Sequence, residues 1–248
     1  MGVAAVILAG GSGSRLGAGM NKVFLPLAGV PVLVRSVTTA LTVPGVDRVV
    51  VVTRPEEHDQ VAELLAPHLG EREVWLVAGG AQRHDSEWNA LQALATEIDS
   101  GMIDLVAIHD GARPLATGAL WQEVLESART HGGAIPVVRT EDLVHRDREP
   151  LPESVGAVQT PQAFWATPLL QAHREAARLG QKTTDTAACL EQFGTGDFQI
   201  TAVRSTPGNL KITWAEDLAR AQGLVLNQPP AVAPPPPSAP GWPGQAPS

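Results

Sequence analysis

The chain has 248 residues, one cysteine, a formal net charge of -8 and a pI of about 5.3. Its acidic balance argues against a nucleic-acid partner, because binding the phosphate backbone requires a basic surface. The single cysteine excludes a disulfide framework and a multi-cysteine zinc site. This cysteine usage fits a reducing, cytoplasmic compartment. No apolar run approaches the roughly 18 residues of a membrane helix, so we expect no membrane partner.

Strands and helices are predicted to alternate through most of the chain. Short apolar runs predict strands, and helical spacing of apolar residues predicts helices. In chain order the predicted elements are strand 3–8, helix 32–41, strand 46–53, helix 56–69, strand 74–77, helix 87–98, strand 105–108, helix 120–131, strand 133–138, helices 168–179 and 186–193, strand 199–204 and helix 215–226. This repeat predicts an α/β domain with a mostly parallel sheet. Ligands of such sheets bind beyond the carboxyl ends of the strands.

Two segments depart from this alternation. Residues 139–158 are polar and contain prolines, which indicates an excursion from the core such as a hairpin arm. Residues 228–248 hold nine prolines and cannot bury a core, so they are predicted to form a disordered tail.

The first candidate motif follows the first predicted strand. It reads LAGGSGSRLG at residues 8–17, and Asn21-Lys22 comes shortly after it. Glycines let backbone N–H groups approach a triphosphate, and Arg15 and Lys22 add positive charge where negative charge grows during phosphoryl transfer. A plain glycine turn is the alternative. The segment matches neither the P-loop pattern nor the dinucleotide pattern GxGxxG.

Two further motifs also follow predicted strands. Residues 79–86 (GGAQRHDS) can clasp a nucleotide at a helix N-terminus, although Asp85 or Ser86 as a simple N-cap is as good a reading. In residues 109–114 (HDGARP), Asp110 can hold Mg²⁺ and Arg113 can clamp a phosphate. The alternative there is an ordinary turn with an Asp–Arg ion pair. Loops that follow parallel strands converge on one edge of the sheet.

Three weaker motifs complete the set: QTPQAF at 159–164, TDTA at 184–187 and NLKIT at 209–213. Taken together, the six motifs resemble, in order, those of the 2-C-methyl-D-erythritol 4-phosphate cytidylyltransferase family of isoprenoid synthesis. The ribitol-5-phosphate cytidylyltransferases share most of them. The resemblance spans residues 4–217.

The resemblance implies a Rossmann-like, GT-A-like three-layer nucleotidyltransferase domain at residues 1–227, with a mostly parallel sheet and a protruding β-arm at about 138–158. It implies transfer of CMP from CTP to 2-C-methyl-D-erythritol 4-phosphate, with Mg²⁺ bound at Asp110, by a homodimer joined through the arm. The implied residues are Arg15, Lys22 and Lys211 for catalysis; Ala9, Gly10, Gly11, Gly13, Gly80, Arg83, Ser86 and Asp110 for CTP; and Asp110, Arg113, Thr140, Thr160 and Thr184 for the acceptor.

Four positions differ from the usual family pattern. Arg139-Thr140 replaces an Asp-Thr pair, Pro152 lies where an arginine is usual, Asn21-Lys22-Val23 replaces Pro-Lys-Gln, and LAGG replaces PAAG. These differences leave open ribitol 5-phosphate or another polyol phosphate as the acceptor. An inactive nucleotide-binding paralogue and a sugar-1-phosphate or molybdopterin nucleotidyltransferase are further alternatives.

Overall fold

The computed structural model describes residues 2–11, 21–139 and 155–227. Several sequence predictions lie outside these ranges: Gly13, Arg15, Thr140, Pro152, most of the arm and the Pro-rich tail.

A continuous apolar run forms the central strand of the sheet. The strand β1 (Gly2–Leu8) reads GVAAVIL, and its side chains are buried on both faces of the sheet, as in an interior parallel strand. It pairs in parallel with β4 (Val46–Thr53) on one side and β6 (Ile103–Asp110) on the other. The carboxyl ends of β1 and β6 therefore meet at one edge, where Leu8 is paired with Asp110.

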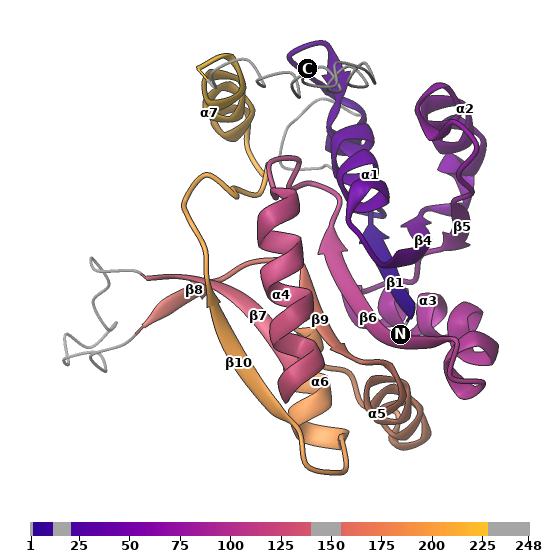
Figure 1. Cartoon of the computed structure of the whole chain (residues 1–248). Helices are drawn as coiled ribbons and strands as arrows, with labels where there is room; N and C mark the ends of the chain where they lie inside the picture. Colours follow the sequence, from indigo (N-terminus) through magenta and orange to yellow (C-terminus); the bar gives the residue numbers. More distant parts are fainter. Residues whose placement is uncertain (1, 12–20, 140–154, 228–248) are drawn as a thin grey trace, which may run out of the picture.

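The full sheet has eight strands in the order β10-β7-β9-β6-β1-β4-β5, with β8 paired to β7 (Figure 1). The remaining strands are β5 (Trp75–Ala78), β7 (Gly132–Arg139), β8 (Gly156–Val158), β9 (Gln162–Trp165) and β10 (Gln199–Arg204). The predicted mostly parallel α/β architecture is confirmed. The antiparallel strand β9, between β6 and β7, was not predicted.

Helices cover both faces of the sheet, giving three layers. One apolar core lies beneath α1 (Val32–Thr42), α2 (His58–Leu69) and α4 (Gly118–His131). A second core lies beneath α3 (Arg83–Asp99), α5 (Ala166–Leu179) and α6 (Thr186–Phe193). Alternate side chains of β1 pack into opposite cores. Val3, Ala5 and Ile7 belong to the first core, and Ala4 and Val6 to the second.

Smaller elements close one end of the molecule. The strands β2 (Pro26–Leu27) and β3 (Val30–Pro31) form a short antiparallel pair. Ala221 of α7 (Ala215–Leu226) joins Leu27, Val32 and Ile212 in a small apolar cluster there. Two 3₁₀ turns, η2 (Lys22–Phe24) and η3 (Pro55–Glu57), follow β1 and β4. No helix among the described residues is both long and apolar enough to cross a membrane.

The ends of the predicted arm lie side by side. Val137 pairs with Val158 and Arg139 with Gly156 in an antiparallel ladder between β7 and β8. The chain thus leaves the sheet at Arg139 and returns to it at Gly156.

The largest error in the predicted helix boundaries is at the start of α3. The helix α3 begins at Arg83 rather than at Glu87, and its N-cap is Gln82 rather than Asp85 or Ser86. Asp85 is the third helical residue, and its carboxylate accepts a hydrogen bond from the Gln82 N–H at 3.1 Å. This arrangement puts Arg83 and Ser86 in the first turn of the helix.

Candidate active site

A cavity of about 360 Å³ lies at the carboxyl edge of the sheet. Its walls come from the segments that follow β1 and β5, from the end of β6, and from residue 211, which precedes α7. The lining residues are Leu8, Ala9, Gly10, Gly11, Lys22, Val23, Gly80, Ala81, Gln82, Arg83, Ser86, Asp110, Ala112 and Lys211. Two of the three lysines of the chain therefore face the same cavity, as the sequence predicted.

Two other cavities of the described chain are larger, at about 500 and 710 Å³. They border α4, and neither is lined by a lysine. The smaller cavity gathers more cations and lies where α/β sheets bind ligands, so we take it as the candidate site.

Asp110 is the centre of the charge cluster in this cavity. Its carboxylate forms an ion pair with Arg83 through Oδ1, and its Oδ2 lies 2.9 Å from Lys211 Nζ and 3.5 Å from Arg113 Nε. Burial alone would raise the pKa of Asp110, but the charges of Arg83, Lys211 and Arg113 outweigh it and hold the pKa well below its ordinary value. Asp110 is therefore ionised at neutral pH and holds three cations around one point.

The backbone of Asp110 is fixed from behind by Thr160 and His109. The Asp110 N–H donates to Thr160 Oγ1 at 2.9 Å, and Thr160 Oγ1 lies 3.1 Å from His109 Nδ1. The His109 Nε2 lies 3.2 Å from the Arg113 carbonyl, which can only accept, so Nε2 carries the proton. Burial lowers the pKa of His109 to about 4, in keeping with this neutral ring. Thr160 thus positions the strand end.

The HDGARP loop is tied to the NLKIT segment. The Arg113 guanidinium donates to the Asn209 carbonyl at 2.7 Å, and the Ile212 N–H donates to the Ala112 carbonyl at 2.9 Å. Asn209 is itself buried and donates to the Thr160 carbonyl at 2.9 Å. These bonds explain why Lys211, remote in sequence, reaches Asp110.

A second buried network sets the position of Lys22. Asn21 is 1% exposed, and its Nδ2 donates to the Ala9 carbonyl at 2.8 Å and to Glu57 Oε2 at 3.0 Å. Glu57 also accepts from Thr53 and Arg54. Burial would raise the pKa of Glu57, but hydrogen bonds from Arg54 and Asn21 lower it. The end of β1 is thereby fastened to the turn that carries Lys22.

The loop between β5 and α3 has no room for a side chain at Gly80. A Cβ there would overlap the Asp85 Cβ, and the Gly80 N–H donates to Ser86 Oγ at 3.1 Å. Lys182, the third lysine, pairs with Asp85 at 2.7 Å. It is absent from the residues that line the cavity.

Sequence reasoning missed Glu87, which supports Arg83. Its Oε1 lies 2.8 Å from Arg83 Nε and accepts from Thr186 Oγ1 at 2.8 Å. Burial raises the pKa of Glu87 to about 7, against the opposing effect of Arg83. The i, i+4 spacing of Arg83 and Glu87 is a usable signal, but only once the helix is known to start at Arg83.

The structure brings most of the predicted residues together. Ala9, Gly10, Gly11, Lys22, Gly80, Arg83, Ser86, Asp110 and Lys211 all line the cavity. Arg113 and Thr160 contact Asp110 from outside the lining, and Thr184 is exposed and does not line it. Such a cavity, with cations over glycine-rich backbone, suits a polyphosphate ligand.

Similarity to known proteins extends over the whole described fold. The family model described as 2-C-methyl-D-erythritol 4-phosphate cytidylyltransferase matches residues 3–227. Proteins of that name from Geobacillus kaustophilus and Symbiobacterium thermophilum are 35% and 37% identical, each over 230 residues. The alignments cover 90% of this chain in both cases, and 97% and 92% of the two relatives.

Solved structures share the architecture. The crystal structure of 4-diphosphocytidyl-2C-methyl-D-erythritol synthase from Anaerococcus prevotii superposes with a TM-score of 0.77 at 25% identity, covering 91% of this chain and 96% of that one. The crystal structure of 2-C-methyl-D-erythritol 4-phosphate cytidylyltransferase from Thermus thermophilus gives a TM-score of 0.66 at 26% identity, covering 89% and 98%.

Proposed function

The chain belongs to the 2-C-methyl-D-erythritol 4-phosphate cytidylyltransferase family, and we propose that the cavity described above carries out the transfer of CMP from CTP to 2-C-methyl-D-erythritol 4-phosphate. The observation that carries this proposal is that Arg83 and Lys211 pair with Asp110 in a cavity that Lys22 also lines. The products are 4-diphosphocytidyl-2-C-methyl-D-erythritol and pyrophosphate.

The reaction is an in-line displacement at the α-phosphorus of CTP. A phosphate oxygen of the acceptor forms the new bond to that phosphorus, while the bond to the bridging α–β oxygen breaks and pyrophosphate leaves with the electron pair. No general base is needed, since a phosphate oxyanion is already a nucleophile. Lys22 and Lys211 neutralise the charge that builds up on the phosphate oxygens.

Asp110 contributes by preorganising the cationic side chains around it. Before substrate binds, its carboxylate holds Arg83, Lys211 and Arg113 within reach of one another. Cations fixed in advance need little rearrangement when a triphosphate enters, which favours the transition state. The N–H groups of Gly10 and Gly11 are the backbone donors for the nucleotide, whereas the Gly80 N–H is held by Ser86 Oγ. Gly13 and Arg15 belong to the same site as predictions that the described residues do not test.

Asp110 also suits Mg²⁺. It is the one carboxylate among the lining residues of the described cavity, and Mg²⁺ characteristically binds one or two carboxylates together with substrate phosphates. A carboxylate offers about four lone-pair positions, so the ion pairs to Arg83 and Lys211 leave capacity for a cation. When bound there, Mg²⁺ would neutralise charge on the triphosphate.

We expect the acceptor to bind on the side of the site where Arg113 and Lys211 lie. The Arg113 guanidinium donates to the Asn209 carbonyl and contacts Asp110 from outside the cavity lining, and Thr160 likewise positions Asp110 rather than reaching the cavity. The roles of Thr184 and Thr140, and of a partner's arm in a homodimer, stay predictions of the resemblance.

The test is pyrophosphate release with CTP and Mg²⁺, comparing methylerythritol phosphate with ribitol 5-phosphate. We expect turnover with methylerythritol phosphate and much slower turnover with ribitol phosphate. Faster turnover with ribitol 5-phosphate would instead identify that compound as the acceptor. A preference for GTP, UTP or dTTP would contradict the nucleotide assignment, and CTP binding without pyrophosphate release from any polyol phosphate would indicate an inactive paralogue.

A further inference from the structure

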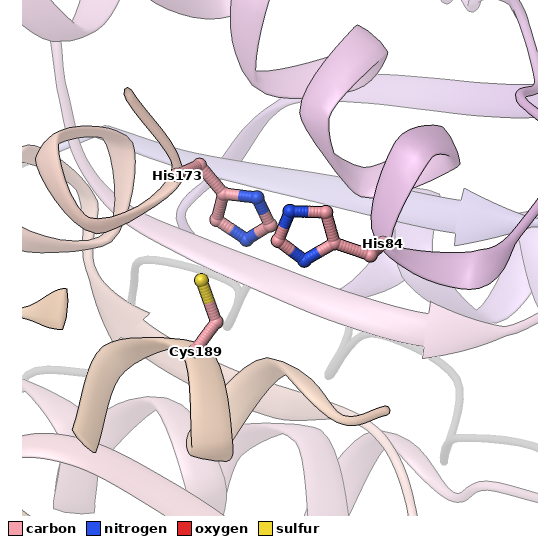
Figure 2. A group of neighbouring side chains, drawn as sticks. All are labelled: His84, His173 and Cys189. Carbon is pink, nitrogen blue, oxygen red and sulfur yellow. The ribbon is translucent and has the colours of Figure 1, made fainter. Parts of the chain in front are cut away.

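Three metal-binding side chains meet between the helices on one face of the sheet, apart from the Asp110 cluster. His84 comes from α3, His173 from α5 and Cys189 from α6. Figure 2 shows the two imidazole rings side by side, with the thiol of Cys189 directed toward them. One potential ligand atom from each residue lies within 4.8 Å of the others.

All three side chains are buried. His173 and Cys189 are fully buried and His84 is 5% exposed. Burial lowers the pKa of His84 and His173, the latter to about 3, and raises the pKa of Cys189 to about 11. In the structure as described, two neutral rings therefore face a thiol in an apolar layer.

The hydrogen-bonding capacity of His173 is unused. Neither of its ring nitrogens has a hydrogen-bond partner among the described residues, although the ring has no contact with solvent. Its Nε2 lies 3.7 Å from Glu87 Oε2, which is too long for a hydrogen bond. A buried polar ring without a partner costs free energy, and a ligand bound to one of its nitrogens would offset that cost.

The neighbours of the cluster add further donors. His84 Nδ1 lies 3.2 Å from Thr183 Oγ1, and the Thr183 hydroxyl also donates to the Asp185 carbonyl at 3.2 Å. The Glu87 carboxylate borders the cluster through the 3.7 Å approach to His173. Hydroxyl and carboxylate groups of this kind orient the ligands of metal sites.

We propose that His84, His173 and Cys189 bind a Zn²⁺ ion. Two imidazoles and a thiolate are the ligands that borderline transition metals prefer, whereas Mg²⁺ prefers oxygen donors. Three protein ligands leave one tetrahedral position, and Glu87 Oε2, 3.7 Å from His173 Nε2, is an oxygen donor beside the cluster. The ion would join α3, α5 and α6, and would brace the first turn of α3, where Arg83 precedes His84.

Binding requires a local rearrangement. The two rings are stacked, with centroids 4.6 Å apart and planes inclined by 23°. Ligand atoms around tetrahedral Zn²⁺ are roughly 3.3–3.6 Å apart, given Zn–N of about 2.0 Å and Zn–S of about 2.3 Å. The rings must therefore open and the thiol approach them, with release of the thiol proton.

The sole cysteine makes the test specific. The full-length protein, stripped with a chelator and kept reduced with a phosphine, is titrated with Co²⁺ and followed by absorption. We expect a near-ultraviolet thiolate-to-Co²⁺ charge-transfer band and visible bands of tetrahedral Co²⁺, saturating at one ion per chain and abolished by Zn²⁺. Only Cys189 can supply the thiolate. Zn²⁺ should also raise the melting temperature.

Variants separate this site from other metal binding. Cys189→Ser should lose the charge-transfer band and His173→Gln should weaken it strongly, with the fold checked by circular dichroism. His131→Gln alters an exposed histidine on α4 and should leave the band unchanged, as should Asp110→Asn, which alters the proposed Mg²⁺ ligand. Absence of the charge-transfer band in the wild-type protein at saturating Co²⁺ would overturn the proposal, and so would a band that a folded His173→Gln variant retains in full.

Discussion

The Lys211 ammonium lies 2.9 Å from the Asp110 carboxylate, and this ion pair joins the segment before α7 to the end of the central strand β6. Two hydrogen bonds hold the pair in place: the Ile212 N–H donates to the Ala112 carbonyl, and the Arg113 guanidinium donates to the Asn209 carbonyl. An incoming triphosphate would compete with Asp110 for the same ammonium group. The ion pair with Asp110 thus holds the Lys211 ammonium group at the cavity before a triphosphate binds.

Replacing either cavity lysine should remove most of the activity. We expect Lys22→Ala and Lys211→Ala each to raise the barrier by roughly 2–4 kcal/mol, about 30- to 900-fold in kcat/KM, because each cation faces developing phosphate charge. Steady-state pyrophosphate release measures the effect.

The third lysine gives a matched control for this experiment. Lys182 is half exposed and pairs with Asp85 outside the cavity lining. Exposed ion pairs contribute little, so Lys182→Ala should keep near-wild-type kcat/KM. Equal losses in all three variants, or near-normal kcat in Lys22→Ala, would refute the assigned roles.

Asn21 should be more important for the fold than its place in a loop suggests. Asn21→Ala leaves the Ala9 carbonyl without its Asn21 donor and removes one donor from Glu57, which should cost about 1–3 kcal/mol of unfolding free energy. The isosteric Asn21→Asp should cost more, because it buries a second carboxylate against Glu57. Urea unfolding measures both values. An Asp variant as stable as wild type would contradict this account of the network.

The elements with strong periodicity could be predicted from the sequence. Strands 46–53 and 199–204 and helices 186–193 and 215–226 agree with the structure at both ends, because apolar patterning and turn residues point the same way there. The strand β9 was missed because its four residues carry no usable period. Its position depends on long-range pairing with β6 and β7.

The charged half of the site was predictable, but its supports were not. The motifs that follow predicted strands pointed to Lys22 and Asp110, and the family resemblance pointed to Lys211. Glu87 reads in sequence as an ordinary surface carboxylate, and only the fold shows that it is buried against Arg83. The use of the Thr160 hydroxyl likewise depends on β9 lying beside β6, which no local pattern reveals.

Acidification should destabilise the protein through His109. Burial lowers its pKa from 6.5 to about 4, so between these values the unfolded chain binds more protons than the folded one. Stability must then rise with pH through this window and fall as the pH is lowered. His109→Gln keeps a polar side chain without the titration, and should reduce the slope by up to about 1.4 kcal/mol per pH unit.

Urea unfolding from pH 7 to pH 4 in the presence of a chelator measures these slopes. His173, whose pKa burial lowers to about 3, titrates in the same direction and is unchanged in both proteins. Parallel pH profiles for wild type and His109→Gln would show that folding leaves the pKa of His109 unchanged, against the lowering assigned to its burial.

Two glycines of the cavity should respond differently to alanine. At Gly80 a Cβ would overlap Asp85, so Gly80→Ala should lower the melting temperature and disturb the start of α3, which carries Arg83. At Gly11 a Cβ meets nothing within 4 Å, so Gly11→Ala should leave the melting temperature unchanged. Because Gly11 lines the cavity, its added methyl group should still raise KM for CTP, through lost approach of the nucleotide to the backbone. A Gly11→Ala variant with unaltered KM would mean that the triphosphate does not lie against this loop, and the glycines would then serve only the turn after β1.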